Sequence, residues 1–389
     1  MHETDSGIPL HLAQATLTVD LAAIAANWRL LRDTAAPAEC AAVVKADAYG
    51  TGSEQVARAL AAAGCRTFFV AHASEAIRLR RQLSAPEFRI YVLNGLAGGD
   101  NTVRTKTVRT KTVRAMRDHD LRPVICCMED LQLWLGITPP GHPANIGLQF
   151  STGMNRLGFF PADAAKTAQL TAGLPGLTID FVMSHFVSSE ITGDPLNDQQ
   201  IADFASIRVL FPSVPASLAN SSGIFLPQAP HYDLVRPGYA LFGGNPLPGR
   251  TNPMQHVVRL QAPVLQVRHI QTGETAGYNG VWKAQRKSTL AIIGVGYADG
   301  FLRSAGGQDN PAHALIGGVP CPVAGRVSMD LLILDATDAP PGDVRPGAMA
   351  ELLGSTIGID DLAARCGTIG YEILTNLGCR YHRTYTNAL

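Results

Sequence analysis

Short apolar runs alternate with alanine-rich, amphipathic stretches over the first 240 residues of the chain. The apolar runs are rich in β-branched residues and indicate strands, and most of the gaps between them have room for a helix. Eight such runs occur, at 41–45, 67–71, 90–93, 123–126, 146–150, 179–184, 216–219 and 233–236. Apolar strands that alternate with helices favour a parallel sheet, and eight of them predict an α/β fold, a closed eight-stranded parallel (β/α)8 barrel.

Two of the expected helices carry their own start and stop signals. Asp20 is placed to cap a helix over 21–34, because its side chain can accept from a free N–H of the first turn. Ser53 is placed to cap a second helix over 54–63, which Gly64 would end in a left-handed conformation.

The pattern changes near residue 245. Gly, Pro and Asn cluster over 243–253 and predict a linker. Beyond it, β-type segments occur at 257–270, 288–298, 320–329, 331–336 and 348–354, with one helix near 359–366. We therefore expect two domains: a barrel domain with a short N-terminal strand over 1–245, and a β-rich domain over 246–389.

Composition narrows the class of function. The 389 residues include 32 basic and 32 acidic side chains, which argues against a dedicated nucleic-acid or membrane-surface role. Seven scattered cysteines without a C-x-x-C pair give no reason to expect a metal site or a disulfide framework. The N-terminus lacks the basic start and apolar stretch of a signal peptide, so a reducing cytoplasm is expected.

A five-residue repeat, TVRTKTVRTKTVR, occupies 102–114, where the helix before the fourth strand is expected. The simpler interpretation is a duplication tolerated on a solvated face. The alternative is a basic contact patch for an anion or a partner, formed by Arg104, Lys106, Arg109, Lys111, Arg114 and Arg117.

Lys45 ends the first strand, at the barrel face where catalytic groups gather. Burying the charge of a lysine in that position costs free energy unless the amine is functional or paired. Taken alone, the residue is more simply interpreted as a surface lysine. Tyr49 follows on a glycine-flanked turn. This spacing suits a lysine that binds a carbonyl cofactor covalently, with a phenol nearby to bind its phosphate.

The turns after strands seven and eight are rich in Gly and Ser, with ANSSG at 219–223 and RPGYALFGG at 236–244. Barrels often bind phosphate at this place through backbone N–H groups. Ser221, Gly238 and the N–H of Tyr239 are therefore candidate phosphate ligands, and plain turn residues are the alternative.

Nine sequence blocks between residues 43 and 374 resemble the ordered signature blocks of the alanine racemase family, and the resemblance as a whole runs from about residue 16 to 385. They are VVKADAYGTG, STGMNRLGF, MSHF, LANSSG, YDLVRPGYALFG, GYNGVW, GVGYADGFLR, GRVSMD and GTIGYEIL. The resemblance implies a barrel followed by a β domain, as the hydrophobic pattern predicts. It also implies an isomerase with pyridoxal 5'-phosphate as cofactor, a small amino acid as substrate, and a homodimer with shared active sites.

The resemblance gives each motif residue a role. Lys45 would carry the cofactor, Arg236 would face the pyridine nitrogen, and Arg156 would face the cofactor's phenolic oxygen and the substrate carboxylate. The phosphate would be held by Tyr49, Ser221, Gly238, Tyr239 and Tyr371.

The remaining roles fall on the second half of the chain. Tyr278 would be the second acid/base, oriented through His185. Met329 would offer its backbone N–H to the substrate carboxylate, with Asp330 beside it, and Tyr297 would line the entrance. Tyr278 and Met329 would come from the partner subunit.

These residue types suit racemisation, which removes a proton from one face of a carbon and returns one to the other. Lys45 would serve the D face and Tyr278 the L face. A free tyrosine has a pKa near ~10, so ionising it at pH 7 costs roughly 4 kcal/mol, and a relay through His185 to Arg236 would lower that cost. Arg236 would also keep the ring nitrogen unprotonated, which disfavours side reactions.

Three positions depart from the pattern of many family members. Gln149 stands where a carbamylated lysine is common, Ser151 where an aspartate is common, and Ser328 where a cysteine often precedes the Met-Asp pair. Gln149 could still accept a hydrogen bond from Arg156 and orient it.

Three alternatives stay open. A racemase for serine or for a broader range of amino acids would use the same residues. A decarboxylase of the same fold would carry a Gly-Gly-Gly run, a Glu-Pro-Gly-Arg block and an acidic residue at the ring nitrogen, and neither motif occurs here. A non-enzymatic cofactor-binding barrel would lack the second domain.

Overall fold

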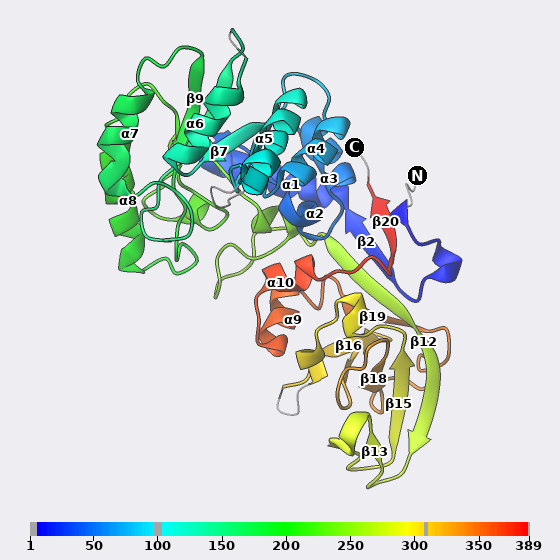
Figure 1. The fold of residues 1–389 in the computed structure, drawn as a ribbon. Coiled ribbons are helices and arrows are strands. Elements are labelled where there is room, and N and C mark those ends of the chain that lie inside the picture. The colour runs from blue at the N-terminus through cyan, green and yellow to red at the C-terminus, as the bar shows by residue number, and fades with distance from the viewer. Residues whose placement is uncertain (1–5, 97–102, 140, 307–309, 388–389) are drawn as a thin grey trace.

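The computed structural model describes residues 6–96, 103–139, 141–306 and 310–387. Its first half is a ring of parallel strands surrounded by helices (Figure 1). The first strand of the ring has two parts. The strands are β3 (Glu39–Cys40) with β4 (Ala42–Val43), β5 (Thr67–Val70), β6 (Arg89–Val92), β7 (Arg122–Ile125), β8 (Ala144–Gln149), β9 (Leu177–Met183), β10 (Ala216–Ser217) and β11 (Leu234–Val235).

Backbone hydrogen bonds close this ring. The strands from β4 to β10 form one parallel sheet in chain order, and β11 pairs in parallel with β3. Between β10 and β11, the N–H of Asp233 donates to the carbonyl of Ala216 (3.0 Å), and the N–H of Arg236 donates to that of Ala219 (2.9 Å). The predicted eight-stranded barrel is therefore confirmed.

Helices cover the outside of the barrel because each places an apolar face on the strands. They are α1 (Leu21–Ala35), α3 (Ser53–Ala63), α4 (Ala73–Gln82), α5 (Val103–Asp118), α6 (Met128–Ile137), α7 (Ala164–Thr171) and α8 (Pro195–Arg208). Among the described residues, none of the helices has the length and apolar character that a bilayer crossing requires.

The two predicted helix caps have different outcomes. Asp20 caps α1 as expected, since its side chain accepts from the N–H of Ala23 (3.0 Å). The prediction for Ser53 is wrong by one position: Ser53 is the first helical residue, and Gly52 takes the cap position. The carboxylate of Asp47 accepts instead from both the N–H and the hydroxyl of Ser53, at 2.8 Å each.

The repeat at 102–114 falls mainly in α5, and the side chains of Arg104 and Lys106 lie outside the described part. Two of the remaining cations are used within the chain. Arg109 pairs with Asp130 of α6, and Arg117 lies over the ring of Trp134 at 5.2 Å. Arg109, within the repeat, and Arg117, just beyond it, therefore pack one side of α5 on α6.

The second half is a mainly β domain, as predicted. Its sheet is built around the long strand β12 (Val258–Ile270), which pairs with β2, β15 and β19. The other strands of this half are β13 (Thr275–Ala276), β14 (Trp282–Lys283), β15 (Ser288–Ile293), β16 (His313–Ile316), β17 (Val319–Pro322), β18 (Leu332–Asp335), β19 (Met349–Leu353) and β20 (His382–Thr386). Helix α9 (Ile359–Cys366) lies where one helix was expected, and α10 (Gly370–Thr375) was missed because it is too short for a periodic pattern.

The N-terminal strands belong to this second sheet. β1 (Ser6–Gly7) pairs with β20, and β2 (Thr16–Asp20) lies between β20 and β12, parallel to the former and antiparallel to the latter. The last residue of β2 is also the cap of α1, so this strand joins the two halves. The division of the chain near residue 245 stays a prediction.

Loss of the Asp20 cap should be measurable as a loss of stability. We expect Asp20→Ala to lower the free energy of unfolding by about 1 kcal/mol, because a free N–H of α1 then loses its partner. Asp20→Ser should retain most of the stability. Urea unfolding of the three chains at one protein concentration measures the difference, and equal losses in the two variants would contradict the capping role.

Candidate active site

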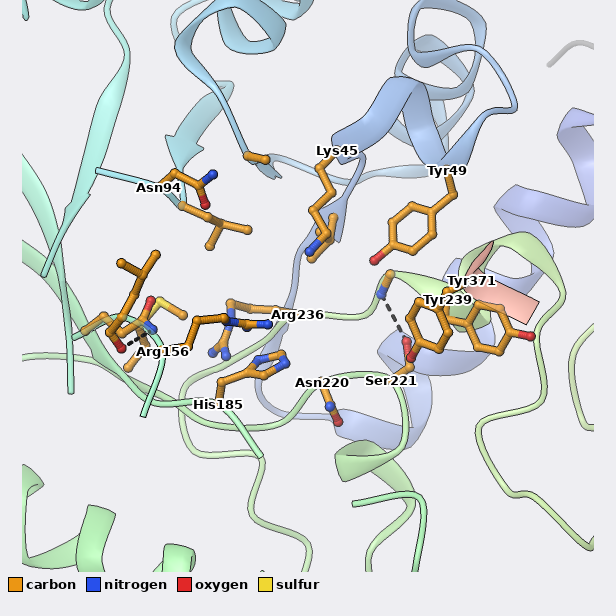
Figure 2. Close-up of a pocket in the computed structure, with 17 residues that line it drawn as sticks. Lys45, Tyr49, Asn94, Arg156, His185, Asn220, Ser221, Arg236, Tyr239 and Tyr371 are labelled. Atoms are coloured by element: carbon orange, nitrogen blue, oxygen red, sulfur yellow. Dashed lines mark hydrogen bonds between the residues drawn. The ribbon is translucent and has the colours of Figure 1, made fainter. Parts of the chain in front are cut away.

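A cavity of about 550 Å³ opens at the carboxyl ends of the barrel strands. Predicted site residues line it from several strand ends, and α10 of the second domain adds one more (Figure 2). They are Lys45, Tyr49, Arg156, His185, Ser221, Arg236, Gly238, Tyr239 and Tyr371. Among the residues described, no Asp or Glu side chain lines the cavity, so its charged groups are cations.

Lys45 enters the cavity from a left-handed turn, α2 (Lys45–Tyr49). The four residues after Lys45 all have positive φ values, between 53° and 54°. Each left-handed non-glycine residue costs roughly 1–2 kcal/mol, so surrounding contacts must hold the turn. The turn directs the Lys45 amine and the Tyr49 ring into the same space (Figure 2).

The second domain provides part of that support. Gly50 ends the turn with a φ of 78°, and a Cβ built on it would lie 2.3 Å from the carbonyl oxygen of Leu374 in α10. Arg383 of β20 donates to the carbonyl of Gly50 (2.9 Å). The barrel's lysine turn is therefore packed against the C-terminal part of the same chain.

Burial lowers the pKa of the Lys45 amine, and the nearby guanidinium of Arg156 lowers it further. Both effects disfavour the ammonium form, since burial removes water from the charge and Arg156 repels it. A larger fraction of the amine is therefore neutral and nucleophilic at a given pH than for a free lysine.

A cradle of hydroxyl and backbone N–H groups lies on the Tyr49 side of the cavity. The hydroxyl of Ser221 accepts from the N–H groups of Gly238 (3.0 Å) and Ala240 (3.2 Å). A Cβ on Gly238 would lie 2.4 Å from the hydroxyl of Tyr49, so this position requires glycine. The cradle combines a small backbone turn with hydroxyl groups, which is the chemistry that binds phosphate.

Tyr239 is fixed by the second domain. Its hydroxyl donates to Asp360 of α9 (2.5 Å), and its ring stacks on Tyr371 with centroids 4.0 Å apart. The hydroxyl is thus already engaged, which leaves the backbone N–H as the group of Tyr239 that suits an anion in the cradle.

Arg236 lies buried between Lys45 and His185 (Figure 2), with 4% of its surface exposed. Its guanidinium donates to the hydroxyl of Ser217 and to the carbonyl of Ser184 (2.6 Å). Burial lowers the pKa of this guanidinium to about 9, so these contacts hold a group that is still a cation at neutral pH.

His185 is neutral in this setting. Burial lowers its pKa to about 3, and the charges of Arg236, Arg156 and Lys45 act in the same direction. No hydrogen bond joins His185 to Arg236 in the described part of the chain, so Arg236 acts on it through charge. Gln200 of α8, which the sequence did not single out, donates to the His185 carbonyl (3.0 Å) and holds its backbone.

The expected contact between Gln149 and Arg156 takes another form. Gln149 donates from its amide nitrogen to the carbonyl of Leu157 (3.0 Å), one residue beyond Arg156, and the described hydrogen bonds include none between Gln149 and Arg156 themselves. Gln149 thus holds the loop that carries Arg156 and leaves the guanidinium exposed at the cavity.

Two further polar residues of the cavity were not predicted from the sequence. Asn94 lies two residues beyond Val92, the last residue of β6. Asn220 lies between β10 and Ser221, where its side chain accepts from the N–H of Gly223 (2.9 Å). Both lie at strand ends, so the rule that found Lys45 would also have found them.

Four predicted site residues lie apart from the cavity of this chain: Tyr278, Tyr297, Met329 and Asp330. All are on the second domain. Tyr278 is 63% exposed and Met329 is 52% exposed, which leaves both available to another surface.

Together, these features define a closed-barrel protein in which one cavity holds a half-buried lysine amine beside a cradle of hydroxyl and backbone N–H groups. The chain belongs to the alanine racemase family. The family model described as alanine racemase, N-terminal domain, matches residues 19–246, and the one described as alanine racemase, C-terminal domain, matches residues 257–385.

Individual relatives agree with this assignment. The chain is 52% identical over 375 residues to the alanine racemase of Methylobacterium nodulans, covering 95% of this chain and 96% of that protein. Its fold matches the alanine racemase of Bartonella henselae, solved with covalently bound pyridoxal phosphate, with a TM-score of 0.86 and 35% identity over 96% and 99% of the two chains. The fold also matches the biosynthetic alanine racemase of Pseudomonas aeruginosa, with a TM-score of 0.87 and 32% identity over 96% of this chain and 100% of that chain.

The lowered pKa of His185 should appear in the pH dependence of stability. The unfolded chain binds a proton at this histidine near pH 6.5, whereas the folded chain does so only near pH 3. Stability therefore falls with decreasing pH, by about 1.4 kcal/mol per pH unit within that window. We expect His185→Gln to remove this slope in urea unfolding between about pH 6 and 4. The exposed His256→Gln variant is the control, and an unchanged slope in His185→Gln would contradict the assignment.

Proposed function

We propose that this protein is a pyridoxal-phosphate-dependent alanine racemase that interconverts L-alanine and D-alanine. The observation that carries the proposal is the cavity in which Lys45, Arg236 and the Ser221–Gly238 cradle converge without a carboxylate. A decarboxylase of the same fold needs an acidic residue at the ring nitrogen, and no described cavity residue offers one. The second domain argues against a single-domain cofactor-binding barrel.

The residues present fit pyridoxal phosphate. The amine of Lys45 would hold it covalently, and Ser221, Gly238, Tyr239, Tyr49 and Tyr371 would hold the phosphate. Arg236 would face the ring nitrogen and, as a cation at neutral pH, would keep that nitrogen unprotonated. When bound, the cofactor supplies an electron sink that makes the substrate's α-proton labile.

Two groups on opposite sides of the substrate carbon would handle the proton. Lys45 is half-buried with a lowered pKa, so its amine is suited to take and return a proton on the D face. Tyr278 of the partner would act on the L face. Because His185 is neutral, it can donate or accept a hydrogen bond to the phenol without adding a second charge beside Arg236.

The four residues outside the cavity support a homodimer with shared sites. Tyr278 and Met329 are exposed on the second domain of one chain, and the tyrosines that line its own cavity, Tyr49, Tyr239 and Tyr371, are those assigned to the phosphate. A partner that presents its Tyr278 and the Met329 N–H would complete the site, with Asp330 beside the substrate carboxylate and Tyr297 at the entrance.

Two finer points remain predictions. The substrate is a small amino acid, and a racemase for serine or for a broader range would share the same groups. The cytoplasmic location rests on the seven free cysteines, which suit a reducing compartment.

Chiral product analysis over a panel of L-amino acids tests the reaction. We expect D-alanine from L-alanine, and Lys45→Ala should lose both the activity and the visible absorbance of the lysine-linked cofactor. Release of carbon dioxide without D-product would select the decarboxylase, and a retained absorbance band in Lys45→Ala would remove the lysine from its role.

A mixed dimer tests the shared site. Lys45→Ala and Tyr278→Phe chains with different tags should each be inactive alone, although Tyr278→Phe should retain the cofactor. The doubly tagged mixed dimer should recover about half of the parent activity, because one of its two sites combines an intact Lys45 with an intact Tyr278. An inactive mixed dimer, beside an active doubly tagged parent dimer, would mean that each site is built from one chain.

A further inference from the structure

Glu75 of α4 does not line the cavity, and its carboxylate accepts three backbone hydrogen bonds. One oxygen accepts from the N–H of Ala46 (2.7 Å). The other accepts from the N–H groups of Ala71 (2.8 Å) and His72 (3.1 Å). The Ala46 N–H belongs to the peptide group directly after Lys45, so one side chain of α4 ties the lysine's own backbone to the end of β5.

Helix capping explains only one of the two oxygens. A carboxylate at the third position of a helix commonly accepts from the N–H of the cap residue, as Glu75 does from His72. Asp361 does the same at the start of α9, where it accepts from Gly358 (3.1 Å). The second oxygen of Glu75 reaches outside its own helix, to a residue 29 positions earlier in the chain.

The hydrogen bond from Ala46 to Glu75 lies at the start of the left-handed turn, where the unfavourable backbone requires support. Ala46 is the first of four consecutive left-handed residues, and none of the four is a glycine. A strained conformation persists only where neighbouring groups over-determine it. Gly50 and Arg383 hold the far end of the turn, and Glu75 holds the end that carries Lys45.

Charge gives Glu75 a second effect on the lysine. Burial and Arg156 lower the pKa of the Lys45 amine, whereas the carboxylate of Glu75 raises it. His185 also faces the cavity and is neutral. Glu75 is thus the negative counterpart of Arg156 beside this amine.

We propose that Glu75 is a positioning residue for Lys45, which fixes the left-handed turn so that the amine meets the cofactor in a set direction. The inference rests on the proposed function. Glu75 touches neither cofactor nor substrate, and it acts through the backbone of Ala46.

Cofactor affinity tests the proposal. We expect Glu75→Ala and the isosteric Glu75→Gln to bind pyridoxal phosphate roughly tenfold more weakly, because a hydrogen bond to a charged acceptor is lost beside the attachment point. Asp361→Ala removes a comparable cap from α9 and should keep the parent affinity. Equilibrium titration of the cofactor-free full chains gives the dissociation constants.

A second readout needs no cofactor. Acetylation of the cofactor-free chain by acetic anhydride at several pH values, read by mass spectrometry at Lys45 against the exposed Lys283, reports the Lys45 pKa. Glu75→Gln should move the half-maximal pH down, and Arg156→Ala should move it up.

The outcomes separate this inference from the proposed function. Parent affinity in Glu75→Gln, an equal loss in Asp361→Ala, or an unmoved labelling profile would each overturn the positioning role. If Glu75→Ala does not fold, Glu75→Gln alone decides. A parent chain that binds no pyridoxal phosphate would refute the proposed function, and the labelling profile would still report on Glu75.

Discussion

The left-handed turn after Lys45 is the constraint on which the site depends. The left-handed conformation of four consecutive residues is unfavourable, so contacts from the rest of the chain must stabilise it. Support comes from α4 through Glu75, from α3 through the contact of Asp47 with Ser53, and from the second domain through Leu374 and Arg383. Barrel and second domain are thus needed together to present a single amine.

Electrostatics gives the cavity its chemical character. Lys45, Arg156 and Arg236 face an interior without a described carboxylate, and His185 is kept neutral among them. Such a set repels protons and attracts anions, so it suits a phosphorylated cofactor and a carboxylate substrate. The same set would resist a reaction that needs a protonated ring nitrogen. The proposed reaction type therefore follows from the three cations of the cavity wall together with the absence of a carboxylate among its described residues.

The sequence predicted what depends on periodicity and strand ends. The rule that functional side chains follow the barrel strands identified Lys45, His185 and Arg236. The same rule would have identified Asn94 and Asn220. The turn at 46–49 was hidden because Lys-Ala-Asp-Ala-Tyr has no glycine that marks a left-handed backbone. Glu75 was not predicted because its contact joins two neighbouring βα units. Ser53 was misplaced by one residue because Gly52 takes the cap position, and Asp47 accepts from Ser53. Gln149 was expected to accept a hydrogen bond from the Arg156 side chain, but its amide nitrogen donates to the carbonyl of Leu157 instead.

The sheet of the second domain joins residues from the two extremes of the chain. Thr16 is in register with His382, and Asp20 is in register with Thr386, across the parallel pair of β2 and β20. β2 therefore cannot pair with β20 until the barrel between them in the sequence has been synthesised. The barrel's strands can associate as they emerge, but the sheet that braces the lysine turn is completed only after β20 has been made, and pairings of such long sequence separation form slowly. The cavity consequently becomes competent only once this late pairing has formed.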